Sequence, residues 1–288
     1  MCALNTPESQ QKVVKELIAV GQPVDMETTR EFIEQILENA ALTELRDVED
    51  ELKEKGDRLR KLVAEDNLPT LTEEQLLSIL RAVFATRRRA KEISADVGAN
   101  NLKQAIHELL YGKDETGERF YKFVQTMTEY FEDVRVLRPK KSSDSRARES
   151  AEVAATQENV FCDLASELLH FTNPDQYWLW TRWIWDPKAG TGALPLVAVE
   201  EINLFGENVG ETYLKIGMAL AFVKETGDAA GFENFSDSPY SIDVFIACVY
   251  AVYMYTTLRI RMTQEFNKVV PQLPELIRRI LGVWKLEL

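Results

Sequence analysis

Apolar residues recur every three or four positions along residues 8–135, and charged residues and alanine fill most positions between them. This spacing places the apolar side chains on one face of successive amphipathic helices. Glycine, proline and asparagine indicate the breaks between helices, which fall at 21–23, 56, 67–69, 98–100 and 112–117. The pattern therefore predicts five or six helices in this part of the chain.

One helix start is specified in detail at Thr72. Residues 72–75 read Thr-Glu-Glu-Gln, which matches a capping box. In that motif the Thr72 hydroxyl accepts a hydrogen bond from the Gln75 amide, and the Gln75 side chain accepts one from the Thr72 amide. We expect a helix to begin there.

Helical spacing continues in the second half of the chain. It predicts helices over 151–170, 174–185, 207–225 and 239–266, and a short last helix after Pro274. Residues 193–204 are interpreted as mostly helical and 227–239 as a loop. Residues 244–258 carry no charge, but they are fewer than the roughly 20 apolar residues that span a bilayer. We expect them to form a buried core helix, and we expect no membrane-spanning segment.

Composition changes abruptly at residues 138–149, which hold five basic residues and three serines but no large apolar side chain. We interpret this segment as a basic linker. The predicted fold is all-α: a multi-helix bundle in two helical regions, an acidic N-terminal region at 1–137 and an aromatic-rich C-terminal region at 150–288.

Charge and cysteine content limit the classes of partner and compartment. The 47 acidic and 34 basic residues give a formal charge of -13, which opposes nonspecific attraction to nucleic acid or anionic lipid. Cys2, Cys162 and Cys248 are scattered and form no CxxC pair, which favours neither a disulfide framework nor a thiolate metal site. The first residues lack the basic and apolar regions of a signal peptide. We therefore expect a cytoplasmic protein.

The most unusual local feature is the segment 177–185, which holds four of the five tryptophans. On a helix, one face would carry Tyr177, Trp180 and Ile184, and another would carry Trp178, Arg182 and Trp185. If the first face is core, the second is available to stack on a ligand, a base or a neighbouring domain. The alternative is an aromatic core between domains. The candidate binding residues are Tyr177, Trp178, Arg182, Trp185 and Asp186.

Asp186 begins a glycine-rich turn, 186–192, whose backbone amides would suit an anion if they were exposed. The turn lacks the Walker pattern and the GxGxxG fingerprint, so a plain loop is the alternative interpretation.

Two basic clusters are candidate phosphate contacts. One is Arg87, Arg88 and Arg89, and the other is the linker, with Lys140 and Lys141. The alternative is a helix end stabilised by cations, followed by a solvated linker.

No catalytic residue can be assigned from motifs. His107 and His170 lie in different predicted helices, which excludes HExxH chemistry. Glu167 and His170 match one ExxH unit of carboxylate-bridged metal bundles, but the second unit that such a site needs is missing. No serine lies in GxSxG. We predict no metal site and assign no cofactor.

Two pairs of stretches resemble helical modules of restriction- and repair-associated proteins, including helical DNA glycosylases. They are 109–112 followed by 118–120, and 167–171 followed by 174–177. The glycine-rich hairpin and the catalytic Lys or Asp of the glycosylases have no match in this chain. The resemblance implies nucleic-acid binding.

The function expected from these observations is that of an interaction or regulatory protein without catalysis of its own, acting on a protein partner. The alternative is nucleic-acid binding or processing, with the basic clusters on phosphates and the tryptophans on unpaired bases. An enzyme with a pocket buried among helices is a third class, because such pockets are built from residues far apart in sequence.

Overall fold

The computed structural model describes residues 25–137, 146–198, 202–229, 238–261 and 272–284. Within these ranges the chain forms twelve α-helices and one short 3-10 helix, and it has no strand. A single isolated bridge joins Asp186 to Thr191. The predicted all-α multi-helix bundle is therefore confirmed. Among the described helices, none is both long and apolar enough to cross a membrane.

The chain forms two compact units, each discontinuous in sequence. Unit 1 takes its described residues from 1–54, 181–205 and 214–286. Unit 2 takes its described residues from 55–180 and 206–213. Helices α3 (Leu42–Leu62) and α11 (Val209–Ala229) each contribute residues to both units.

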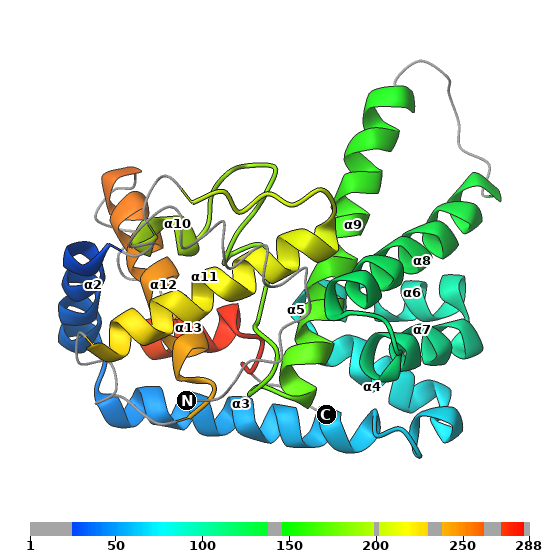
Figure 1. Ribbon diagram of the computed structural model, residues 1–288, viewed down its shortest axis with the longest axis horizontal. Coiled ribbons are helices and arrows are strands. Elements are labelled where there is room, and N and C mark those ends of the chain that lie inside the picture. The colour runs from blue at the N-terminus through cyan, green and yellow to red at the C-terminus, as the bar shows by residue number, and fades with distance from the viewer. Residues whose placement is uncertain (1–24, 138–145, 199–201, 230–237, 262–271, 285–288) are drawn as a thin grey trace. The chain divides into compact units, whose positions relative to one another are not determined.

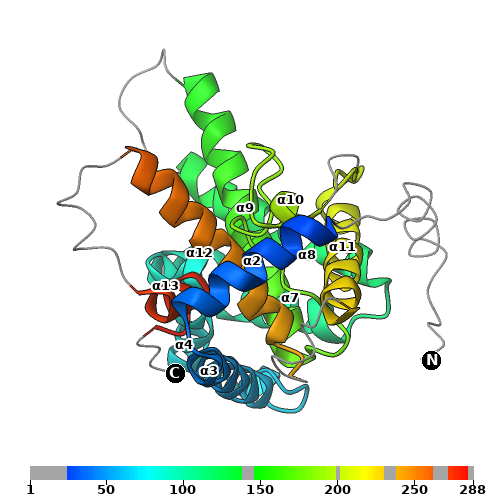
Figure 2. The ribbon, with the colours of Figure 1, turned by 90° about the vertical axis from the view of Figure 1, so that its left-hand side faces the viewer.

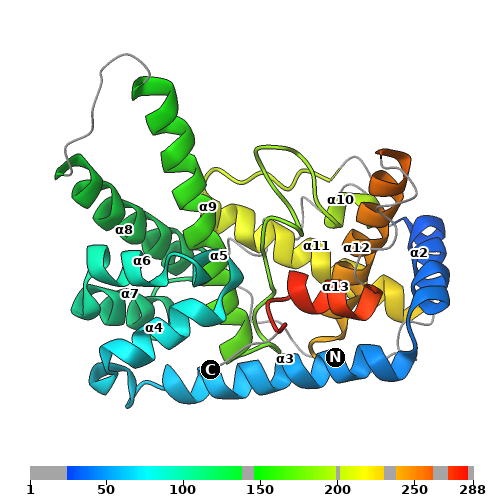
Figure 3. The same cartoon turned by 180° about the vertical axis from the view of Figure 1, so that it is seen from behind.

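Unit 2 is built around α8 (Thr116–Leu137), which packs against α7 (Ala99–Tyr111), α6 (Ala90–Val97) and α9 (Arg146–Thr172). Figure 3 shows α6 and α7 beside α8. The buried rings of Phe131 on α8 and Phe161 on α9 meet edge to face, with their centroids 5.8 Å apart. The unit is completed by η1 (Leu68–Thr70), α4 (Glu73–Ala82) and α5 (Phe84–Arg87). Its core is therefore shared by helices from both sides of the predicted linker.

Unit 1 is centred on α12 (Ser241–Arg261), which packs against α2 (Met26–Asn39) and α13 (Leu273–Ile280). Figure 2 shows α2 crossing α12. Residues 241–249 of α12 are all buried, as expected for a central helix. The Nε–H group of Arg278 on α13 donates a hydrogen bond that is shared between the two carboxylate oxygens of Glu51 on α3, at 2.8 and 3.0 Å. The short helix α10 (Leu194–Val197) also contacts α2.

Most predicted helix boundaries in the first half are confirmed. The α-helices are interrupted at 63–72, around the predicted break at 67–69, at Gly98 within 98–100 and at 112–115 within 112–117. Helix α4 begins with the predicted capping box, and the predicted break at 21–23 lies outside the described residues. The predicted break at Gly56 is wrong, because α3 runs through it. Gly56 is buried, so packing on that face offsets the weak helix propensity of glycine. The described part of 8–135 holds seven helices, more than predicted.

In the second half, the long helices α9, α11 and α12 and the last helix α13 are confirmed. The described part of α12 ends at Arg261, and α11 extends to Ala229, within the predicted loop 227–239. The predicted helix at 174–185 is wrong, since this segment consists of turns and residues without regular secondary structure. Of 193–204, only α10 is helical among the described residues. The central part of the expected core helix, residues 244–252, is buried apart from Tyr250.

The predicted linker is only partly described. Its last four residues, 146–149, form the start of α9, and 138–145 lie outside the described residues. The division into regions 1–137 and 150–288 therefore stays a prediction. Figure 1 shows α8 and α9, the helices on either side of the linker, and they pack against each other within unit 2.

Candidate functional site

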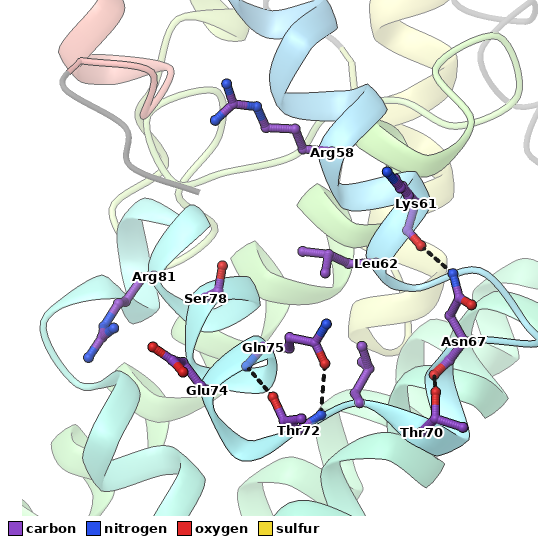
Figure 4. Close-up of a pocket in the computed structure, with 11 residues that line it drawn as sticks. Arg58, Lys61, Leu62, Asn67, Thr70, Thr72, Glu74, Gln75, Ser78 and Arg81 are labelled. Atoms are coloured by element: carbon purple, nitrogen blue, oxygen red, sulfur yellow. Dashed lines mark hydrogen bonds between the residues drawn. The ribbon is translucent and has the colours of Figure 1, made fainter.

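A groove of about 680 Å³ lies in unit 2 between the last turns of α3 and helix α4 (Figure 4). Helix α3, the loop that follows it and α4 each contribute to its walls. Its lining residues are Arg58, Lys61, Leu62, Asn67, Thr70, Leu71, Thr72, Glu74, Gln75, Ser78 and Arg81.

The loop at one end of the groove is held by local hydrogen bonds. The Asn67 side-chain amide donates to the Lys61 carbonyl (2.8 Å), and the Thr70 hydroxyl donates to the Asn67 carbonyl (2.8 Å). The Gln75 amide donates to the Thr72 hydroxyl (3.2 Å), and the Thr72 amide donates to the Gln75 side-chain oxygen (2.9 Å). The capping box therefore fixes both the start of α4 and this end of the groove.

The charge of the lining is opposite in sign to that of the whole chain. Arg58, Lys61 and Arg81 are cationic and exposed, and Glu74 is the one carboxylate among the lining residues. Their formal sum is +2, in a chain whose net charge is -13. Figure 4 shows Arg58 and Lys61 on α3 and Arg81 and Glu74 on α4. The groove is thus a local positive surface.

Other lining groups add hydrogen-bond donors and an apolar base. The Gln75 side chain keeps its NH2 group as a donor after its oxygen has accepted from Thr72, and Ser78 adds a hydroxyl. Leu71 is buried and Leu62 half-buried. No aromatic residue belongs to the lining. The site therefore suits an anionic group attached to a small apolar body.

The aromatic segment is not helical, and side chains of neighbouring helices bind its backbone. His170 Nδ1 lies 2.7 Å from the Tyr177 carbonyl oxygen, and the Tyr213 hydroxyl donates to the Trp178 carbonyl (3.1 Å). The Trp180 amide donates to the Ser166 hydroxyl (2.5 Å). These bonds take the backbone groups that a helix would pair internally. His170 lies in the last turn of α9.

The two predicted faces of the aromatic segment do not form. Trp180 and Trp185, placed on opposite faces by the helical pattern, are both buried, with 4% and 6% exposure. Tyr177 and Trp178 are half-buried residues of unit 2, whereas Arg182, Trp185 and Asp186 belong to unit 1. Trp178, Arg182 and Trp185 therefore do not share a helical face, and that prediction is wrong. Binding by these residues stays a prediction.

Backbone amides of the Asp186 turn already bind the carboxylate of Asp186 itself. The amides of Lys188 and Ala189 donate to Asp186 Oδ1, at 3.0 and 3.4 Å. The Asp186 amide donates to the Thr191 carbonyl at 2.7 Å, which closes the turn. Two of the amides that were considered for an external anion are thus used internally.

The three arginines of the cluster differ in their surroundings. Arg87 donates to the Arg81 carbonyl (2.9 Å), and Arg89 pairs with Glu92 (3.1 Å) and lies over the Phe131 ring. Arg88 is exposed. Lys140 and Lys141 lie outside the described residues. Phosphate binding by these five residues stays a prediction.

Buried polar residues on α9 serve unit 2 itself. Glu167 pairs with the fully buried Lys55 at 2.6 Å, and the Lys55 ammonium lies 4.2 Å from the centre of the Phe171 ring. No group of three or more potential metal ligands occurs in the described ranges. Cys162 and Cys248 are buried, and burial raises the pKa of both thiols, whereas Cys2 lies outside the described residues.

Sequence reasoning missed the cations of the groove. Arg58, Lys61 and Arg81 belong to two helices separated by a loop, and no motif links them. The one available signal was the capping box, which located the start of α4 but not its neighbour. Comparisons with protein-family models, curated proteins and solved structures find no match to this chain.

Proposed function

We propose that this chain is a non-catalytic interaction protein whose groove in unit 2 binds a short acidic segment of a protein partner. The observation that carries the proposal is the concentration of Arg58, Lys61 and Arg81 in one groove of an acidic chain. Carboxylates would form charge-assisted hydrogen bonds with these side chains, and such bonds are stronger than those between neutral groups.

Two of the groove's cations are available for this role. The side chains of Lys61 and Arg81 form no hydrogen bond or ion pair with any described residue, and the same holds for Glu74. An arriving carboxylate would therefore displace water and not an internal partner. The Gln75 and Ser78 side chains would add neutral donors to the bound segment.

A short protein segment fits the groove better than nucleic acid does. A long polyanion would meet the negative charge of the remaining surface, whereas a short segment meets mainly the groove. Sites for single-stranded nucleic acid also use aromatic side chains on which bases stack, and the lining has none.

The test is fluorescence anisotropy with a labelled hexaglutamate peptide, a hexaglutamine peptide and a single-stranded hexanucleotide as probes. We expect the acidic peptide to bind and the neutral one not to. Lys61→Gln with Arg81→Gln should weaken acidic-peptide binding by about tenfold or more, because two charge-assisted contacts are lost.

The matched control is Arg88→Gln with Lys91→Gln. It removes the same charge from exposed side chains of unit 2 that do not line the groove. Equal loss in both double variants would reject the groove as the site. Tighter binding of the hexanucleotide than of the peptide would favour the nucleic-acid alternative.

A further inference from the structure

A second cluster lies in unit 1, where residues of the 181–198 segment meet α12. The rings of Trp183 and Tyr250 pack with their centroids 6.1 Å apart and their planes at 45°. Both residues are half-buried, so each is in part open to solvent. Tyr253, one turn further along the same face of α12, is 43% exposed. The two elements thus form a surface patch of aromatic rings.

A carboxylate belongs to the same turn as Trp183, since Asp186 follows it by three residues. Burial raises the pKa of Tyr250, and Tyr253 and the Asp186 carboxylate raise it further. The turn holds Asp186 by its Oδ1 atom. Its Oδ2 atom forms no hydrogen bond or ion pair with any residue that the structure describes.

The turn that presents Asp186 is closed in a defined conformation. The Trp183 carbonyl accepts a hydrogen bond from the Ala193 amide (2.9 Å), and the Gly190 amide donates to the Asp186 carbonyl (2.8 Å). Gly192 has φ of 151°, and an added Cβ would collide with the Ile184 carbonyl. Trp183 and Asp186 are therefore positioned by the backbone before any ligand binds.

We propose that Trp183, Tyr250 and Asp186 form a binding site for an alkylammonium group. The faces of indole and phenol rings carry negative charge density that attracts organic cations, and alkyl groups on the nitrogen gain apolar contact with the same rings. The Asp186 carboxylate adds a full negative charge. This site lies in unit 1 and the groove lies in unit 2. A test of one proposal therefore does not decide the other.

Two cationic side chains of the same segment should repel a cationic ligand. Arg182 and Lys188 are exposed, and neither forms an ion pair with a described carboxylate. Both reach into solvent on flexible side chains, where salt screens their repulsion of a ligand. Replacing them with glutamine should therefore tighten cation binding at low salt.

The experiment follows the five tryptophan indole N–H resonances by NMR while tetramethylammonium chloride is added at constant ionic strength. One resonance should move, and it should be the one missing from the Trp183→Leu variant. The neutral probe tert-butanol, of similar shape, should move it much less.

Asp186→Asn should weaken binding several-fold, because it removes the charge but keeps an oxygen to accept from the Lys188 amide. Glu34→Gln is the matched control, since it removes one carboxylate from an exposed position on α2 of the same unit. Arg182→Gln should have the opposite effect and tighten binding, an outcome that loss of folding cannot produce. Equal responses to both probes, or an unchanged affinity in Asp186→Asn, would overturn the proposal.

The source of the ligand is resolved by a peptide carrying one trimethyllysine. Tighter binding of this peptide than of tetramethylammonium would indicate a lysine side chain of a protein. Equal binding would indicate a free quaternary amine.

Discussion

Single residues in unit 2 have roles that their chemistry alone does not reveal. Lys55 is a charged residue in an amphipathic helix, a position usually exposed, yet its side chain is fully buried against Glu167 and Phe171. Lys122 forms an ion pair of similar length with Asp114 (2.8 Å), but both of those side chains are about half exposed. Burial, more than the distance between the charged atoms, decides how strongly the loss of one partner of each ion pair affects the free energy of unfolding.

Lys55→Met should destabilise the protein strongly, because it leaves the Glu167 carboxylate buried without its ammonium partner. The loss in free energy of unfolding should be about 3 kcal/mol or more. Urea denaturation followed by circular dichroism measures it. The double variant Lys55→Met with Glu167→Leu should recover most of the loss, and Lys122→Met should change stability little. A small effect of Lys55→Met alone would show that the pair is dispensable.

At the scale of elements, local signals worked where a helix end is determined by neighbouring residues. The capping box at Thr72 and the breaks at 98–100 and 112–117 depend on side chains within one turn. The helix predicted at 174–185 failed because Ser166, His170 and Tyr213, distant in sequence, bind its backbone. Helical spacing of aromatic residues cannot reveal those partners.

Thr72→Ala should lower the free energy of unfolding by about 1 kcal/mol, since the Gln75 amide loses its acceptor at the helix start. Thr72→Ser keeps the hydroxyl and should retain nearly all of the stability. Thermal and urea unfolding of the three proteins provide the comparison. Because the capping box also holds one end of the groove, Thr72→Ala should weaken acidic-peptide binding as well. Stability equal to that of the wild type would mean that water replaces the cap.

At the scale of the whole molecule, the division predicted from composition can be tested directly. A fragment of residues 1–137 lacks α9, whose Phe161 meets Phe131 in the core of unit 2. It also lacks Trp180, which stacks on Phe120 at 5.9 Å. We expect this fragment to lose helicity and to show no cooperative unfolding transition, by circular dichroism. A cooperative transition would support the regions 1–137 and 150–288 as separate domains.

The sequence by itself determined the helical class, the helix breaks around 67–69, 98–100 and 112–117 and the buried nature of the uncharged helix, because periodicity and capping act over a few residues. Only the tertiary structure decided which distant residues meet: Lys55 with Glu167, the groove cations with one another, and Trp183 with Tyr250. These pairings follow from how helices pack, and packing depends on contacts between residues far apart in the chain.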